Sequence, residues 1–322
     1  MVSMVVWPVT ATVQETLGAA GLWRGAELVL DAAVTIASPS WWGADSRRWS
    51  VRSPVPDQLV GTAAFVKVME PHAHAYVDLA SAFALAVEAG DAGIGPRVHL
   101  ADVDRGLLVM EDLTGLAATA TLDRFDDLDS VEQLVALRRA VHRLPGCTRR
   151  ATVFDDIRAA HRLVVDAGGE LPEDFPWMVR MLGPAEERIA ASGYDLVPCH
   201  GDGNVSNVLI THGDGSLRLV DWDCAALMDP LQDLGVLLQE LRAPDVDARA
   251  VFEMYWGTSD DALFDRCRVY GIADSVRWGL VGAYADAARP GTHEYTKFSD
   301  WQFLRARAAL RDPQFDDRLR NL

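Results

Sequence analysis

The sequence predicts an α+β fold in which a small antiparallel sheet precedes a larger, mainly helical part. Strand-like runs are concentrated in residues 1–113, whereas apolar residues at helical spacing recur through 114–322. The 322 residues, of which 49% are hydrophobic, suffice for one large or two ordinary domains. We therefore expect two parts, 1–113 and 114–322, with Gly115 as a flexible point just after the boundary.

Five strand-like runs and one helix make up the first part. The runs are 27–36, 48–53, 62–69, 98–101 and 106–110, and the third has β-branched and aromatic residues. The alanine-rich segment 73–89 follows the third run and predicts a helix, which Gly90 and Gly93 close. This order favours an antiparallel sheet accompanied by one long helix.

The second part contains three clear helix patterns. Apolar residues recur at spacings of three and four along 131–144 and again along 231–241. The second of these helices has Asp229 as a candidate N-cap and Pro230 at its first position. A third helix is expected over 298–310, so helices dominate this part of the chain.

Charge and composition disfavour several classes of function. Acidic residues number 47 and basic residues 30, and the net charge of −17 argues against a nucleic-acid partner. The same charge fits either simple solubility or attraction of a cationic small molecule. No apolar run reaches the roughly 18 residues of a membrane span, and the N-terminal residues lack a signal peptide's basic start. Four cysteines without a CxxC pair indicate reduced thiols, so we expect a cytoplasmic protein.

Lysine is rare in this chain. Of the 30 basic residues, only Lys67 and Lys297 are lysines, and Lys67 lies in the third predicted strand. A lysine is a compact point charge, whereas arginine presents a planar fork. We therefore single out Lys67 as a candidate functional residue.

The segment 199–233 carries the strongest chemical pattern. Two short apolar strands, 207–211 and 217–221, flank a turn-forming stretch and predict a β-hairpin centred near Asp214. Asn207 and Asp221 are equidistant from that centre, so we expect them opposite each other with Cβ atoms about 5 Å apart. An amide oxygen and a carboxylate at that distance suit Mg²⁺. Asp202, on the loop that enters the hairpin, is then placed to act as a base or to position a hydroxyl.

These motifs resemble a known family. His200-Gly201-Asp202 followed by Asn207 matches the H-G-D-x-x-x-x-N loop of the aminoglycoside phosphotransferase and choline kinase families, which are small-molecule relatives of protein kinases. Residues 220–223 resemble that family's metal-binding Asp segment, and 229–234 are similar to its D-P-x-x-D-L run. The resemblance implies a bilobal protein-kinase-like fold, with a nucleotide-binding N-lobe (1–113) and a C-lobe (114–322). It also implies transfer of the γ-phosphate of ATP, or GTP, to a hydroxyl.

The resemblance assigns a role to individual residues. It implies that Asp202 is catalytic and that Asn207 and Asp221 hold Mg²⁺. The residues that it implies for nucleotide binding, including a phosphate-covering loop, an adenine-reading hinge and a helix acid that pairs with the strand lysine, are Gly43, Ser46, Lys67, Asp78, Glu111 and Leu113. His200 and Asp233 are expected to brace the catalytic loop. Asp223 fits either an acid behind the metal site or a surface residue.

The acceptor is less constrained by the sequence. In the family the last third of the chain lines the acceptor pocket, which here points to Asp286, Glu294, Asp300 and Trp301. Carboxylates suit the ammonium groups of an aminoglycoside-like antibiotic or amino sugar, and aromatic rings suit a choline-like head. A plain acidic surface explains the same residues, so the sequence does not specify the acceptor.

Two other classes of function fit the motifs less well. A nucleotide-binding pseudokinase that regulates a partner is disfavoured, because Lys67, Asp202, Asn207 and Asp221 form a complete set. A protein kinase is disfavoured because no D-F-G or A-P-E sequence follows Asp221. The expected partner is a small-molecule hydroxyl acceptor, and the oligomeric state, the choice between ATP and GTP and a role in antibiotic resistance stay open.

Overall fold

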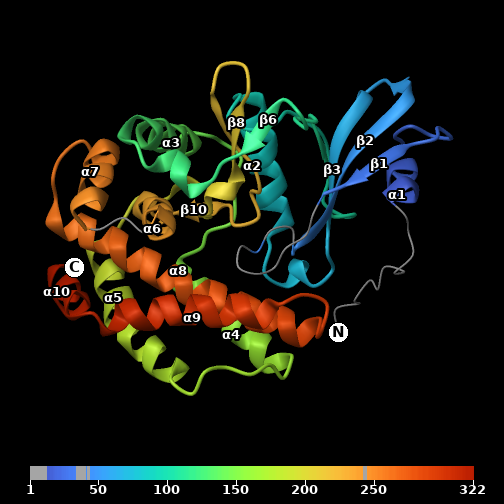
Figure 1. The fold of residues 1–322 in the computed structure, drawn as a ribbon. Helices are drawn as coiled ribbons and strands as arrows, with labels where there is room; N and C mark the ends of the chain where they lie inside the picture. Colours follow the sequence, from blue (N-terminus) through green and yellow to red (C-terminus); the bar gives the residue numbers. More distant parts are fainter. Residues whose placement is uncertain (1–12, 34–40, 42–43, 242–244) are drawn as a thin grey trace.

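The computed structural model describes residues 13–33, 41, 44–241 and 245–322, with the side chains of 245 and 246 left out. It arranges them as a small sheet-containing lobe and a larger helical lobe (Figure 1). The chain passes from one to the other after residue 110, so the predicted boundary near 113 falls in this connection.

A five-stranded antiparallel sheet forms the N-lobe. Its strands are β1 (Val29–Ala32), β2 (Ser46–Asp57), β3 (Gly61–Met69), β4 (Val98–Asp102) and β5 (Leu107–Met110), in the order β1-β2-β3-β5-β4. Helix α1 (Val13–Ala19), which the sequence analysis did not predict, packs its buried side chains on one face of the sheet. Helix α2 (Leu79–Asp91) lies between the sheet and the C-lobe (Figure 1).

Helix α2 begins six residues later than its composition suggested. The Asp78 carboxylate accepts a hydrogen bond from the Ser81 N–H at 2.8 Å and caps the helix. The preceding segment forms only the single 3₁₀ turn η1 (Ala73–Ala75). Alanine content predicted the helix, but the position of this N-cap decides where it begins.

Helix α8 (Asp261–Ala288) is the central element of the C-lobe. It packs against α4 (Val153–Asp166), α6 (Pro230–Leu241) and α9 (Tyr295–Arg311), and most of its residues are buried. The remaining helices surround this group: α3 (Leu128–Val141), α5 (Phe175–Ser192), α7 (Asp245–Trp256) and α10 (Pro313–Asn321), with the 3₁₀ turn η2 (Leu122–Phe125) before α3. The three predicted helices correspond to α3, α6 and α9. No helix in the described part of the chain is long and apolar enough to cross a membrane.

Two small sheets carry the loops between the lobes. Strands β6 (Ala117–Thr119), β8 (Val208–Thr211) and β9 (Leu217–Leu219) form one sheet, preceded by the 3₁₀ turn η3 (Val205–Asn207). Strands β7 (Val197–Cys199) and β10 (Ala226–Met228) form the other. The predicted β8–β9 hairpin is present, but its register is shifted by one residue.

The register error has a simple cause. The Thr211 N–H donates to Ser216 O at 3.0 Å, so the turn contains four residues, 212–215, and not the five that were expected. Val208 consequently faces Leu219, and the Val220 N–H donates to Asn207 O at 2.9 Å. Asn207 therefore lies opposite Val220, and Asp221 is the next residue along the chain.

The contact between α6 and α8 provides a test of the C-lobe packing. A Cβ on Gly235 would lie 2.2 Å from Cys267 O, and one on Gly271 would lie 2.5 Å from Gly235 O. We predict that Gly235→Ala destabilises the protein by about 1–3 kcal/mol, because the two helix backbones must separate. Gly183→Ala in α5 is the control, since no atom lies within 4 Å of its added methyl group. Urea unfolding of both variants measures the difference, and equal stability would contradict the close crossing.

Candidate active site

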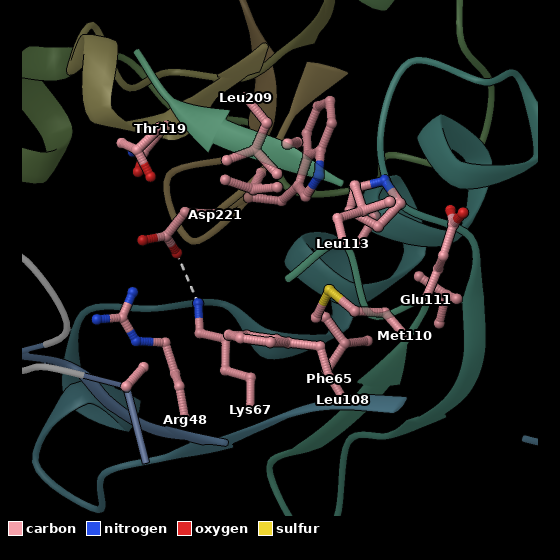
Figure 2. A pocket seen from close by; sticks show the side chains of 18 of the residues that line it. Arg48, Phe65, Lys67, Leu108, Met110, Glu111, Leu113, Thr119, Leu209 and Asp221 are labelled. Atoms are coloured by element: carbon pink, nitrogen blue, oxygen red, sulfur yellow. Dashed lines mark hydrogen bonds and ion pairs between the residues drawn. The ribbon is translucent and has the colours of Figure 1, made fainter. Parts of the chain in front are cut away.

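A cavity of about 340 Å³ lies between the lobes and is lined by β3, β5, α2 and the β8–β9 hairpin. Most of its wall is apolar, with Phe65, Leu108, Met110 and Leu209 among the lining residues (Figure 2). Its polar end contains Lys67 and Arg48, which face each other in the β2–β3 register. Both side chains point toward Asp221 (Figure 2). The cavity thus has a mainly apolar part and, at one end, the two positively charged side chains of Lys67 and Arg48.

The connection after β5 forms the other end of this cavity. Glu111 and Leu113, both expected to form an adenine-reading hinge, line it. The Glu111 N–H donates to Arg97 O at 2.8 Å, and its carboxylate accepts a hydrogen bond from Arg218 at 3.0 Å. These contacts fix the hinge against the residue that precedes β4 and against β9. The adenine-reading role itself stays a prediction.

Asp233 holds the predicted catalytic loop in place. Its fully buried carboxylate accepts hydrogen bonds from the Gly201 N–H at 2.7 Å, from Arg138 at 3.0 Å and from His142 at 2.9 Å. Burial alone would raise the pKa of Asp233, but the charge of Arg138 and the hydrogen bond from His142 hold it well below its ordinary value. Cys199 lies close enough to His142 and Asp233 for the three to share a metal ion, but the carboxylate is already engaged as this brace.

His200 supports the same loop from the other side. Its Nε2–H donates to Val220 O at 2.9 Å, and its ring contacts Trp222 with centroids 4.7 Å apart. Complete burial lowers the pKa of His200 to about 4, so the ring is neutral at physiological pH. The adjacent Gly201 has φ 76°, a conformation that favours glycine. The structure therefore places both predicted bracing residues, His200 and Asp233, behind the loop.

Asp202 faces a second cavity of about 440 Å³. Its Oδ1 accepts a hydrogen bond from the Asn204 N–H at 2.8 Å, and its Oδ2 accepts one from Asn207 Nδ2 at 2.9 Å. A carboxylate offers about four acceptor sites, so these two bonds leave room for a further donor. Burial raises the pKa of Asp202 to about 7. Such a group can accept a hydrogen bond or a proton near neutral pH.

The two cavities meet at a small set of polar residues. Asn207, Asp221 and Asp223 line both of them, whereas Lys67 lines only the first and Asp202 only the second. Asp221 adopts a positive φ of 67°, which is uncommon outside glycine. Amide and carboxylate oxygens at this junction are ligands that suit Mg²⁺. The metal-binding role of Asn207 and Asp221 stays a prediction, although the donor set fits that ion.

Lys67 is paired with two carboxylates of the C-lobe. Its Nζ lies 2.6 Å from Asp221 Oδ1 and 2.7 and 2.8 Å from the two oxygens of Asp223. Burial would lower the pKa of Lys67, but the two acids raise it above its ordinary value. Burial and the charge of Asp221 raise the pKa of Asp223, whereas Lys67 outweighs burial at Asp221 and lowers its pKa. Asp223, for which a surface role was open, is therefore part of the site.

Asp78 and Ser46, both expected to bind nucleotide, are not among the described residues that line the first cavity. The prediction that Asp78 pairs with Lys67 is wrong, because its carboxylate caps α2 and Lys67 pairs with Asp221 and Asp223. Ser46 is buried at the start of β2 opposite Met69 and is not among the described lining residues of the first cavity. Gly43 lies outside the described residues. Asp45 accepts hydrogen bonds from Trp41 Nε1, at 2.7 Å, and from the Tyr76 hydroxyl, and it lines the second cavity.

Of the four residues expected at the acceptor pocket, only Trp301 is among the described residues that line the second cavity. Asp286, Glu294 and Asp300 are not among the described residues that line the second cavity. Glu294 precedes α9 and pairs with Lys297, and Asp300 is exposed on α9. The expectation that these three residues share a pocket with Trp301 is corrected, because Glu294 and Asp300 are exposed and Asp286 lies near the C-terminal end of another helix, α8.

Several lining residues were missed by sequence reasoning. Arg48 enters the first cavity through strand register, for which the sequence offers no local signal. The second cavity also contains Trp41, Glu240, Asp274, Trp278 and Phe298. Asp274 and Arg277 form a buried ion pair at 2.7 Å within α8. Other charged residues, such as Asp265 and Arg266, occur in the same helix, so the sequence alone does not single out this pair.

Comparison with protein families identifies the family to which these motifs belong. Residues 37–270 match the model of the phosphotransferase enzyme family, APH. The chain belongs to this family. It is accordingly a small-molecule phosphotransferase with a hydroxyl acceptor, and the family predicted from its motifs is confirmed. No curated protein sequence matches the chain significantly.

Solved structures of phosphotransferases share the fold. A choline/ethanolamine kinase family protein from Mesorhizobium loti has a TM-score of 0.72 at 22% identity, with 92% of this chain and 93% of that chain covered. Choline kinase LicA from Streptococcus pneumoniae has a TM-score of 0.72 at 16% identity, with 92% and 97% covered. A GDP complex of an aminoglycoside 2′-phosphotransferase IIIa mutant has a TM-score of 0.61 at 12% identity, with 92% and 97% covered. This similarity confirms the protein-kinase-like fold of this family member.

The raised pKa of Asp202 predicts a pH-dependent effect on stability. The fold penalises the charged carboxylate, so its destabilising effect increases between the ordinary pKa of 3.8 and about 7 and is complete above that. Asp202→Asn should therefore gain stability relative to wild type as the pH rises from 5 to 8, by up to a few kcal/mol. Thermal unfolding in EDTA, at several pH values between 5 and 8, measures the difference in stability between the variant and the wild type. Asp104→Asn, in an exposed turn, is the control, and a pH-independent difference for Asp202→Asn would contradict the burial argument.

Proposed function

We propose that this phosphotransferase moves the γ-phosphate of ATP, or GTP, to a hydroxyl of a small cationic molecule. The observation that carries the proposal is the meeting of two cavities at Asn207, Asp221 and Asp223. Asp202 lies on one side of this junction and Lys67 on the other. A phosphate donor in the first cavity and an acceptor in the second would bring their reacting groups together there.

The first cavity suits a nucleotide. Its apolar walls offer a slot for a base, next to the hinge residues Glu111 and Leu113. Lys67 and Arg48, at the opposite end, would neutralise the phosphates. We assign residues 1–113 as the nucleotide-binding lobe and 114–322 as the lobe that carries the catalytic loop and the acceptor cavity. ATP as the donor fits the expected cytoplasmic location.

Mg²⁺ fits the junction because Asn207 and Asp221 offer oxygen donors that line both cavities. When bound there, the ion supplies positive charge to the phosphate oxygens. Asp202 would accept a hydrogen bond from the acceptor hydroxyl and orient it for attack. Its raised pKa suits proton acceptance as the new bond to phosphorus forms. Positioning and electrostatics are the main demands of this chemistry.

The second cavity suits an ammonium compound. Trp41 packs against Phe298 with ring centroids 4.6 Å apart and against Trp278 at 5.9 Å, and Trp301 completes an aromatic wall. Carboxylates of Asp202, Asp223, Glu240 and Asp274 line the same space. Aromatic faces attract ammonium groups. The wall favours a compact ammonium alcohol such as a choline-like compound, and the carboxylates also suit an amino sugar or aminoglycoside, which would link the enzyme to antibiotic resistance.

The catalytic role of Asp202 is tested by Asp202→Ala. We expect turnover to fall by about 10²–10⁴-fold, because the acceptor hydroxyl loses its orienting group. Binding of a fluorescent ATP analogue should survive, since Asp202 does not line the nucleotide cavity. Nucleoside-diphosphate release and fluorescence titration measure the two effects. Unchanged turnover would remove the assignment.

The acceptor class is tested with a matched pair of alcohols. Choline and its uncharged analogue 3,3-dimethylbutan-1-ol have the same shape and differ in charge. We expect kcat/KM for choline to exceed that of the analogue by about tenfold or more, because a cation–π contact contributes about 1–2 kcal/mol. Trp278→Leu should reduce this ratio. Kanamycin in the same diphosphate-release assay reports on the aminoglycoside alternative. Equal use of charged and neutral alcohols would contradict a cationic acceptor.

A further inference from the structure

The lysine of the nucleotide cavity has no acid partner on helix α2. The side chains of α2 that line the cavity beside Lys67 are Ala82, Phe83 and Ala86. Helix α2 is described in full, and its region contains three acids. Asp78 caps the helix, Glu88 lies against Gly146, and Asp91 is exposed. None of these carboxylates is among the ion-pair partners of Lys67.

The two acids that do hold Lys67 differ in their surroundings. Asp223 contacts Nζ with both oxygens, at 2.7 and 2.8 Å, and its side chain is 12% exposed. Asp221 contacts Nζ with one oxygen at 2.6 Å, and its side chain is 35% exposed. Asp221 is therefore the acid that faces the open junction, while Asp223 lies deeper.

The backbone between the two acids is fixed. Trp222 is 5% exposed and packs on His200, whose own Nε2–H bonds to Val220 O. The positive φ of Asp221 turns the chain at this point. Asp223 is thus carried by an anchored segment and does not depend on the movement of a surface loop.

We infer that Asp223 is the positioning residue for Lys67 and replaces the missing helix acid. The inference rests on the proposed function, in which Asp221 is needed at the metal and phosphates. Asp223 then keeps Lys67 extended across the cavity while Asp221 turns to its other partners. Because Lys67 is on β3 and Asp223 is on the C-lobe, the ion pair also couples the position of the lysine to the contact between the lobes.

A double-mutant cycle tests this inference. The variants are Asp223→Asn, Lys67→Met and the combination, with Asp223→Glu as the conservative rescue and Asp104→Asn as a charge-matched control in an exposed N-lobe turn. The first measurement is the affinity for a fluorescent ATP analogue with Mg²⁺, by fluorescence titration, and it requires neither acceptor nor turnover. Circular dichroism and thermal unfolding confirm that each variant is folded.

We expect Asp223→Asn to weaken nucleotide binding by about tenfold, because Lys67 loses a partly buried partner. In the Lys67→Met background the same substitution should change the affinity by less than about twofold, or strengthen it slightly, because only the repulsion between Asp223 and the phosphates is then removed. Asp223→Glu should recover most of the affinity. In steady-state kinetics, KM for ATP should rise by a larger factor than KM for the acceptor, because Asp223 acts mainly through Lys67 although it also lines the second cavity.

Other outcomes overturn the inference in distinct ways. An equal loss in the Lys67→Met background would mean that Asp223 acts independently of the lysine, for instance as a metal ligand. A change confined to KM for the acceptor would mean that Asp223 acts on the acceptor and not through Lys67. Wild-type affinity in Asp223→Asn would overturn the inference while leaving the proposed function intact, whereas a wild-type protein that binds no nucleotide would overturn the proposed function itself.

Discussion

The buried carboxylate of Asp233 is the interaction on which the catalytic part of the structure depends. It lies on α6 and joins the Gly201 backbone N–H to Arg138 and His142 of α3 and its C-terminal end. A fully buried charge is costly unless its partners are complete, and here three donors satisfy it. The same Arg138 also donates to Asp202 O. The ion pair between Asp233 and Arg138 thus connects α6 and α3 and holds the backbone of Gly201 and Asp202.

A second electrostatic cluster lies where the lobes meet. Asp45 is buried, and Asp221 and Asp223 are partly buried, close to Lys67 and Arg48, and burial raises the pKa of Asp45 to about 6. Concentrating acids here opposes folding, since each loses hydration. The arrangement would suit the cationic partners proposed above, Mg²⁺ and an ammonium acceptor. The stability lost at such a site is typical of functional regions, where strain and unfavourable charge are retained for chemistry.

Sequence patterns anticipated the architecture well where the signal was local. Binary patterning located β3, α3, α6 and α9, and the cap at Asp229 was also correct, since its carboxylate accepts a hydrogen bond from the Leu231 N–H at 2.9 Å. The prediction was wrong where one residue changed the outcome. A turn of four residues instead of five shifted the β8–β9 register, and the N-cap at Asp78 turned an expected ion-pair acid into a helix start.

The sequence by itself determined the family and the predicted catalytic loop, because the residues that define them lie within 35 consecutive positions, 200–234, at fixed spacing. Its strand and helix patterns along the whole chain determined the fold class. Only the tertiary structure decided which acids hold Lys67, that Arg48 enters the first cavity, and that Trp41, Asp274 and Trp278 line the second. These residues come from distant segments, and their meeting depends on strand register, helix rotation and packing between lobes. Spacing along the chain carries no information about such contacts.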